Sequence, residues 1–443
     1  MAEELTSLTA IEAAELIAAG ELTSEAYVGA CLDRIAAMDG EVRAFVHIDP
    51  DAALAQAQAL DERQRDGGPL GLLHGVPVGI KDIFDTADYP TESGSPVLKG
   101  RRPREDATAV ARLRAAGAVI IGKTVTTECA YFHPGPTRNP HDLTRTPGGS
   151  SSGSAAAVAA EMVPLAIGSQ TNGSVIRPAA FCGVYGFKPT HGTISRHGAL
   201  LLSRALDHVG TFARSLGDSA LLLEVLAGHD PQGPDTRPIA APDFLELAAD
   251  ELDAPPRLAF VRTPMWDKAD ADTRATFEAL AEELGGDIEE VALPDDFASA
   301  WDDHRVVMAT EMAHNLGAMI GRGSESQSSE ALRAIIAEGA QTSAVRYLAA
   351  RDNALRYRQG IATMLADFDA IVTPAAPGVA PVGEATGSPV FCSLWSLSGV
   401  PAVTLPLLTG QAGLPLGLQL IGTPGGDARL LRTANWLVER LTD

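Results

Sequence analysis

The sequence lacks the patterns of a metal site and of a disulfide-rich protein. Its four cysteines include no CxxC pair, which disfavours both zinc and a disulfide framework. Its ten histidines include no HExxH or similarly spaced cluster. We therefore assign no metal. The sequence also contains no internal repeat and no low-complexity segment.

Basic residues and long apolar runs are scarce as well. There are 34 Lys and Arg against 57 Asp and Glu, a formal charge of −23, which disfavours nucleic acid and anionic membranes as partners. No apolar run reaches transmembrane length, and the acidic, helical start at 1–5 is unlike a signal peptide. The expected location is the reducing cytoplasm.

What is present favours a large α/β enzyme. With 443 residues, 45% of them hydrophobic, the chain can build a large core. Short apolar runs alternate with helical stretches, which predicts a sheet covered by helices. The predicted strands are 76–80, 118–121, 184–187, 257–261, 369–374, 402–406 and 416–421, and the clearest predicted helices are 52–65, 108–116, 154–160, 272–284 and most of 329–366.

The predicted division of the chain follows from changes in residue composition along the sequence. Residues 1–70 are predicted to be an N-terminal helical segment. A stretch rich in Pro, Gly and Asp at 228–242 opens a variable, mostly helical excursion over 228–366. We expect this excursion to belong to one domain spanning 1–443.

Lys81 lies in an unusually apolar segment, Gly75-Val76-Pro77-Val78-Gly79-Ile80-Lys81-Asp82. An ordinary lysine has a pKa of ~10.4, so a lysine that acts as a base near neutral pH must be buried. The alternative is a lysine that pairs with Asp82 or Asp85 on a surface turn.

Two small-residue segments accompany this lysine. Gly149-Ser150-Ser151-Ser152-Gly153 formally matches the nucleophile elbow G-x-S-x-G, but the residues before it cannot form the strand that an elbow requires. Thr171-Asn172-Gly173-Ser174 could aim several backbone N–H groups at one oxyanion. Either segment could also be an ordinary turn.

The three segments together resemble the amidase signature family. The resemblance covers nearly the whole chain, including Gly148–Ala160, Gly168–Thr190 and the C-terminal blocks at 398–402 and 413–422. It implies a single large α/β/α sandwich with a central mixed sheet flanked by helices. It also implies no cofactor, and it leaves the oligomeric state open, a homodimer included.

The resemblance also implies a role for each residue of a Ser–Ser–Lys triad. Lys81 would be the base, Ser150 would follow a cis peptide bond and relay protons, and Ser174 would be the nucleophile. Backbone N–H groups of Thr171, Asn172, Gly173 and Ser174 would form the oxyanion hole.

The chain departs from the common family pattern near the nucleophile. Gln170 replaces a frequent Asp, Asn172 replaces a frequent Gly, and Arg177 lies one residue further from the nucleophile than usual. This form resembles the malonamidase-like branch, in which such an arginine holds a substrate carboxylate. Arg177 could equally be locked in a structural ion pair.

The remaining substrate-binding candidates are Tyr131, Ile176 and Trp395, the last expected in a C-terminal loop. The expected function is hydrolysis of a small linear amide, with or without a carboxylate, through an acyl-enzyme on Ser174. Cleavage of a carbamate, urea-type or aryl-amide bond would use the same triad. A third option is a subunit of an amidotransferase that acts on charged tRNA, which the net charge of −23 makes awkward.

Overall fold

A single mixed sheet runs through the centre of the molecule. The computed structural model describes residues 2–252, 254–321 and 325–442. Its sheet has 11 strands in the order β1-β3-β2-β4-β6-β5-β10-β11-β9-β7-β8. The strands are β1 (Phe45–Ile48), β2 (Pro77–Lys81), β3 (Val119–Thr124), β4 (Leu165–Gln170), β5 (Tyr185–Lys188), β6 (His208–Ala213), β7 (Leu258–Phe260), β8 (Ile288–Glu290), β9 (Ala370–Pro374), β10 (Ala402–Thr409) and β11 (Pro415–Ile421).

The sheet combines two parallel groups with an antiparallel centre. β2 runs parallel to both β3 and β4, and β7 runs parallel to β8 and β9. The pairs from β4 through β6, β5, β10 and β11 to β9 are antiparallel. The prediction of a central mixed sheet is therefore confirmed.

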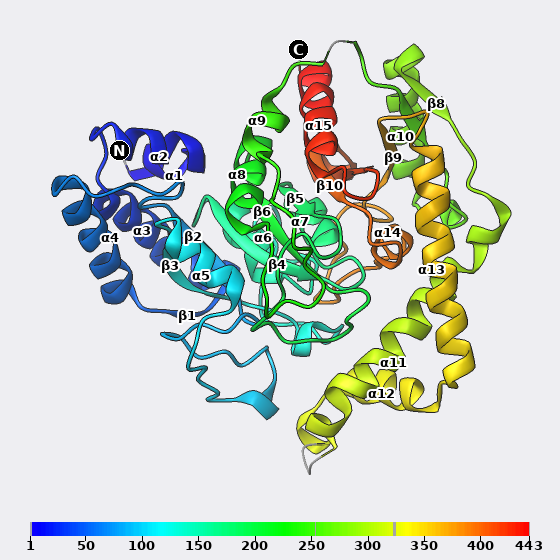
Figure 1. Ribbon diagram of the computed structural model, residues 1–443, viewed down its shortest axis with the longest axis horizontal. Coiled ribbons are helices and arrows are strands. Elements are labelled where there is room, and N and C mark those ends of the chain that lie inside the picture. Colours follow the sequence, from blue (N-terminus) through cyan, green and yellow to red (C-terminus); the bar gives the residue numbers. More distant parts are fainter. Residues whose placement is uncertain (1, 253, 322–324, 443) are drawn as a thin grey trace.

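Helices cover both faces of this sheet, as Figure 1 shows. The helices are α1 (Ala2–Thr6), α2 (Ala10–Ala18), α3 (Ser24–Val42), α4 (Pro50–Arg65), α5 (Thr108–Ala115), α6 (Ser152–Ala159), α7 (Ile176–Cys182), α8 (Leu216–Leu226), α9 (Phe244–Ala249), α10 (Ala271–Leu284), α11 (Ala300–Ile320), α12 (Glu330–Gln341), α13 (Ala344–Met364), α14 (Ser393–Leu397) and α15 (Asp427–Thr442).

The first half of β3, Val119–Ile121, shows why successive residues of a central strand are apolar. Val119 and Ile121 pack with α3, α4 and α6 in one hydrophobic cluster, whereas Ile120 packs with α5 and α8 in the other. Successive side chains of a strand point to opposite faces, so a strand that is covered on both faces favours apolar residues in succession.

The structure contains every predicted strand, and it adds four that the sequence did not reveal. β1 and β8 have only four and three residues, and β4 and β6 mix glycine with polar residues, which weakens an apolar strand pattern. The stretch 329–366 forms two helices, α12 and α13, and α11 precedes them.

The segment 228–366 is not purely helical, because it also supplies β7 and β8 to the central sheet. Its helices α11, α12 and α13 pack on one another at the opposite end of the molecule from α1–α4 (Figure 1). The division into residues 1–443, 1–70 and 228–366 stays a prediction, and residues 1, 253, 322–324 and 443 within those ranges lie outside the described residues.

Candidate active site

Lys81 is the last residue of β2, and its side chain is completely buried. Its Nζ donates hydrogen bonds to Ser150 Oγ at 2.7 Å and to Ser169 Oγ at 2.8 Å. Desolvation lowers the pKa of Lys81 well below 10.5, and the nearby charge of Asp207 opposes this shift only in part. Neither Asp82 nor Asp85 pairs with Lys81 in the described structure, so the surface-turn alternative is wrong.

Ser150 joins the lysine to a small pocket. The Gly149–Ser150 peptide bond is cis, as the resemblance implies. The pocket lies next to Ser150 and Ser174, which are only 2% and 8% exposed. Its lining residues come from separate parts of the chain and are Ala130, Tyr131, Phe132, Ser150, Thr171, Asn172, Ser174, Arg177, Leu202 and Met308.

Ser174 lies in the turn between β4 and α7, and Gln170 holds this turn. Gln170 Oε1 accepts hydrogen bonds from the backbone N–H of Val175 at 2.8 Å and of Ile176 at 3.0 Å. These are orphan donors at the start of α7, so the glutamine supplies the acceptor that a helix N-terminus needs. Its Nε2 also donates to Ser396 Oγ at 3.0 Å, a bond that a carboxylate at this position could not donate.

Three further contacts hold the turn that precedes Ser174. Thr171 Oγ1 donates to Asp207 Oδ1 at 2.7 Å, and Thr171 O accepts from Nε2 of His304 at 3.0 Å. Ser393 Oγ donates to Asn172 Oδ1 at 2.8 Å. Within the described residues, no hydrogen bond engages the backbone N–H of Asn172, Gly173 or Ser174. These donors therefore remain available to a bound oxyanion.

Gly173 has to be a glycine because the chain is crowded there. A Cβ at this position would come within 2.9 Å of Pro389 and 3.2 Å of Cys392. The absence of a side chain lets the loop before α14 approach the turn closely.

Arg177 is buried in α7 with most of its hydrogen-bonding capacity unused. Its Nη2 donates to Gly149 O at 2.6 Å, whereas Nε and Nη1 have no partner in the described structure. The guanidinium carbon lies 5.8 Å from the centre of the Phe132 ring. Desolvation lowers the pKa of Arg177 to about 10. No described carboxylate pairs with it, so the alternative of a structural ion pair is wrong for the described residues.

Of the other substrate-binding candidates, the structure brings only Tyr131 into this pocket. Ile176 is fully buried in α7 and does not line it. Trp395 does not line it either, and the expectation of a loop at Trp395 is wrong, because this residue is 1% exposed within α14. The short serine-rich run around it forms one helical turn, in which Ser393 and Ser396 donate hydrogen bonds to Asn172.

Two residues at the site escaped the sequence analysis. Ser169 could have been found, since it lies inside the small-residue segment that leads to Ser174. His304 offered no signal, because it is a single histidine in α11, and only folding brings it to Thr171. Desolvation lowers its pKa to about 4, so the ring is neutral near neutral pH and Nε2–H can donate.

The described residues contain neither a metal-binding cluster nor a membrane-spanning helix. No group of three or more His, Cys, Asp and Glu side chains could hold a metal ion in that part of the chain. Within the same ranges, every helix is too short or too polar to cross a membrane.

The chain is similar to known proteins over almost its whole length. The family model described as Amidase matches residues 26–431. One subunit of the glutamyl-tRNA(Gln) amidotransferase of Chloroflexus aggregans (strain MD-66 / DSM 9485) is 38% identical, covering 99% of this chain and 97% of the relative.

Solved structures agree with this assignment. The peptide amidase of Stenotrophomonas maltophilia is 32% identical and superposes with a TM-score of 0.85 over 98% of this chain and 97% of that one. A protein described as a vestigial complex that reveals the origins of an s-triazine catabolic enzyme is 31% identical, with a TM-score of 0.90 over 98% of both chains. The chain therefore belongs to the amidase signature family.

Proposed function

We propose that this protein hydrolyses the C–N bond of a small linear amide through an acyl-enzyme on Ser174. The observation that carries the proposal is the buried Lys81 amine, 2.7 Å from Ser150 Oγ, behind a pocket that Ser150 and Ser174 both line. A lysine with a strongly lowered pKa and no carboxylate partner is suited to accept a proton.

In the proposed reaction, one proton moves from Ser174 through Ser150 to Lys81 and later returns through Ser150. Ser174 Oγ attacks the amide carbonyl while its proton passes through the Ser150 hydroxyl to the Lys81 amine. Backbone N–H groups of the turn 171–174 stabilise the oxyanion. The lysine then returns the proton through Ser150 to the leaving amine. Water hydrolyses the resulting ester by the same route and regenerates Ser174.

The guanidinium of Arg177, which pairs with no described carboxylate, favours a substrate that carries a carboxylate close to its amide. A buried cation with two nitrogens that lack hydrogen-bond partners among the described residues is energetically costly, and a bound carboxylate would accept hydrogen bonds from them and neutralise the charge. Phe132 and Arg177 line the same pocket, with the ring centre 5.8 Å from the guanidinium carbon. The malonamidase-like branch predicted from sequence remains part of this proposal.

Mass spectrometry after exposure to a fluorophosphonate tests the nucleophile. We expect one covalent adduct on Ser174 and none in Ser174→Ala. An adduct on Ser150 or on another serine would contradict the assignment. A panel of small amides, carbamates, urea-type and aryl-amide compounds, run alongside, identifies the bond that is cleaved.

Arg177→Ala tests the substrate class. We expect this variant to lose at least about tenfold more kcat/KM on a dicarboxylic monoamide than on the neutral diamide of the same length, because only the acid uses the guanidinium. Equal losses on both compounds would reject the carboxylated substrate while leaving the hydrolytic triad intact.

A second candidate function is participation in an amidotransferase. The 38% identity to one subunit of a glutamyl-tRNA(Gln) amidotransferase, over 99% of this chain, favours it. The formal charge of −23 argues against direct contact with tRNA, so such a protein would depend on partner chains. Glutaminase activity that appears only with a partner chain would support this candidate, whereas turnover of small amides by the isolated chain would support hydrolysis.

A further inference from the structure

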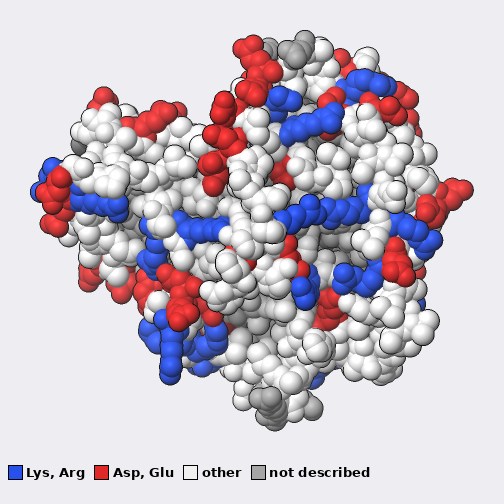
Figure 2. Space-filling view, in the orientation of Figure 1, with Lys and Arg blue, Asp and Glu red and all other residues white. Residues whose placement is uncertain are grey.

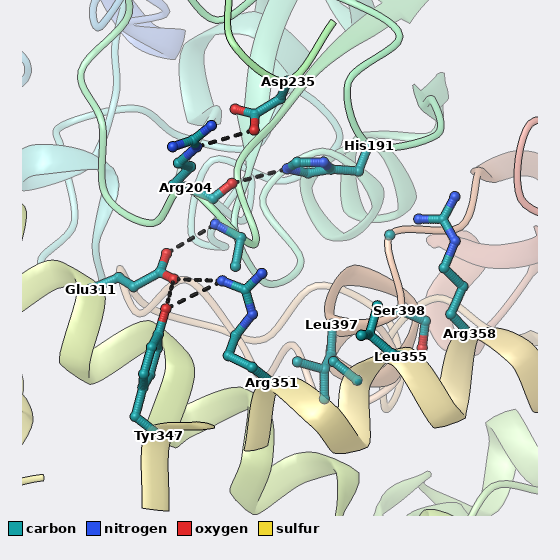
Figure 3. Close-up of a pocket in the computed structure, with 13 residues that line it drawn as sticks. His191, Arg204, Asp235, Glu311, Tyr347, Arg351, Leu355, Arg358, Leu397 and Ser398 are labelled. Atoms are coloured by element: carbon teal, nitrogen blue, oxygen red, sulfur yellow. Dashed lines mark hydrogen bonds and ion pairs between the residues drawn. The ribbon is translucent and has the colours of Figure 1, made fainter. Parts of the chain in front are cut away.

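A second cavity, of about 470 Å³, lies outside the candidate active site. Its walls come from the segment that contains Arg204, from α11 and α13, and from the turn at Ser398–Gly399 (Figure 3). It shares no lining residue with the pocket at Ser174. A volume of this size is within the range of pockets that bind small organic molecules.

Both carboxylates of this cavity are fully engaged by the protein. Glu311 accepts hydrogen bonds from Tyr347 Oη at 2.6 Å and Arg351 Nη1 at 3.0 Å, and also from Ser203 Oγ and the backbone N–H of Ala205. Figure 3 shows the contacts of Tyr347 and Arg351 with Glu311. This carboxylate therefore has no capacity left to neutralise another cation in the cavity.

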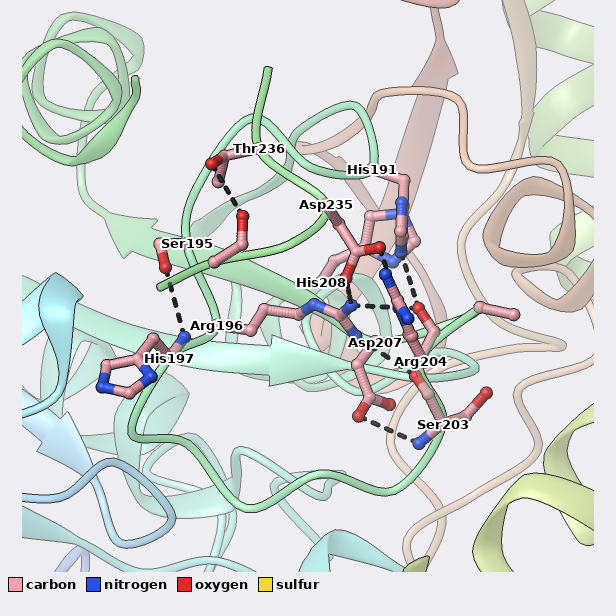
Figure 4. A network of polar contacts seen from close by, with 12 residues as sticks. His191, Ser195, Arg196, His197, Ser203, Arg204, Asp207, His208, Asp235 and Thr236 are labelled. Carbon is pink, nitrogen blue, oxygen red and sulfur yellow. Dashed lines mark hydrogen bonds and ion pairs between the residues drawn. The ribbon is translucent and has the colours of Figure 1, made fainter. Parts of the chain in front are cut away.

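The second carboxylate, Asp235, is held in the same way. It pairs with Arg204 Nε at 3.1 Å and with Arg196, and Figure 4 shows it between these two guanidinium groups. The neighbouring His191 adds no positive charge, because desolvation lowers its pKa to about 4. Its Nε2 donates to Arg204 O at 3.0 Å.

Arg358 is the cation that remains. It is half buried, and it forms no hydrogen bond or ion pair with any described residue. Burial lowers the pKa of Arg358, and the positive charge of Arg237 lowers it further. The negative charge of Asp427 raises this pKa, but it offsets the lowering only in part. Its Nη1 would lie 3.2 Å from a Cβ at position 399, so Gly399 leaves the space beside the guanidinium open.

The charge balance of the cavity follows from these pairings. Among the lining residues, three arginines, Arg204, Arg351 and Arg358, face two carboxylates, Asp235 and Glu311. Asp235 also pairs with Arg196, so positive charge is in excess here in a chain of formal charge −23. On the face seen in Figure 2, Lys and Arg side chains form a band across the middle. A half-buried guanidinium without a partner is unfavourable, and an anion from solution would relieve this cost.

We propose that this cavity binds a small organic anion whose carboxylate or phosphate-type group sits on Arg358. A guanidinium fork recognises either group through paired hydrogen bonds. Leu355 and Leu397 lie between Arg351 and Arg358 in Figure 3 and offer an apolar surface to the body of the ligand. The site is independent of the amide chemistry at Ser174.

Isothermal titration calorimetry with three probes tests the proposal. Phenylphosphonate and benzoate carry the two kinds of anionic group, and benzyl alcohol is their neutral counterpart. We expect at least one of the two anions to bind and the alcohol to bind at least about tenfold more weakly, since it cannot pair with a guanidinium. Whichever of the two anions binds with the lower Kd identifies the type of anionic group that the cavity prefers.

Matched variants of α13 locate the binding site. Arg358→Gln should raise the Kd of the bound anion at least about tenfold, because the charged hydrogen bonds are lost. Arg356→Gln removes the same charge from an exposed position of the same helix and should leave Kd within about twofold. Leu355→Glu adds a negative charge at a residue that is 67% exposed, and it should weaken binding without endangering the fold.

A variant of the active-site arginine separates the two cavities. Binding should persist in Arg177→Met. An unchanged Kd in both Arg358→Gln and Leu355→Glu, loss of binding only in Arg177→Met, or no binding of either anion at millimolar concentration would overturn the proposal. Because the readout is binding rather than turnover, none of these results bears on amide hydrolysis.

Discussion

Two lysines on neighbouring strands, Lys81 on β2 and Lys123 on β3, are both completely buried, yet they have different partners. Lys123 Nζ lies 3.2 Å from the carboxylate of Asp82 and also donates to Phe84 O, Pro90 O and Thr91 Oγ1. Among the described residues, Lys81 Nζ forms hydrogen bonds only with the hydroxyls of Ser150 and Ser169.

This difference in partners separates a structural lysine from a candidate base. Burial lowers the pKa of both side chains, but the Asp82 carboxylate offsets part of the shift for Lys123. A carboxylate and three further acceptors stabilise the ammonium form, whereas hydroxyls can accept from an ammonium or donate to a neutral amine. Burial alone therefore does not create a base, and the absence of an adjacent carboxylate is equally important.

The largest effect is expected for Lys81→Met. We expect kcat to fall by about 10³- to 10⁴-fold, because a positioned general base contributes on this order. Thermal unfolding should show a Tm no lower than that of the wild type, since methionine fills the buried space without a charge. Turnover that survives this change would refute the assignment of Lys81 as the base.

The pH dependence of the enzymatic rate is the next test of whether Lys81, unlike Lys123, acts as a base. The amine of Lys81 is neutral above its lowered pKa and protonated below it, so activity should be lost as the pH falls through that value, by about tenfold per pH unit. Steady-state rates across a pH series measure this limb. The limb should remain in His304→Gln, and a limb that disappears there would assign the titration to the histidine instead.

Lys123→Met should have its main effect on stability rather than on catalysis. The substitution leaves the Asp82 carboxylate buried without a cation, which costs about 3–5 kcal/mol of unfolding free energy. Chemical denaturation measures the loss. The double variant Lys123→Met, Asp82→Asn should recover part of it, because it removes both charges, and full additivity of the two single changes would contradict a direct pair.

The smallest effect is expected at His304, whose ring hydrogen-bonds to Thr171 O in the turn before Ser174. His304→Leu leaves Thr171 O without its donor, so we expect kcat to fall about tenfold with little change in KM. His304→Gln, which keeps an N–H donor, should retain most of the activity. Equal losses in both variants would indicate a packing role rather than a positioning role.

Much of the fold was predictable because long local signals agreed with the final structure. The apolar run before Lys81 predicted a buried strand, and the strand β2 ends at that lysine. The strands β4 and β6 escaped prediction because each mixes glycine with polar residues, Ser169 and Gln170 in β4 and His208 and Thr211 in β6, so neither shows a continuous apolar run. Trp395 was misplaced because a five-residue helix has too few residues to show helical periodicity.

The sequence by itself determined the alternation of strands and helices, the three small-residue segments and the apolar surroundings of Lys81, since each depends on residues close together in the chain. Only the tertiary structure decided that Lys81 faces hydroxyls while Lys123 faces a carboxylate. It also decided that His304 reaches Thr171. Finally, it decided that Arg177 and Arg358 lack anionic partners among the described residues. These contacts join residues far apart in sequence, and whether a buried charge is neutralised depends on which distant groups the fold places beside it.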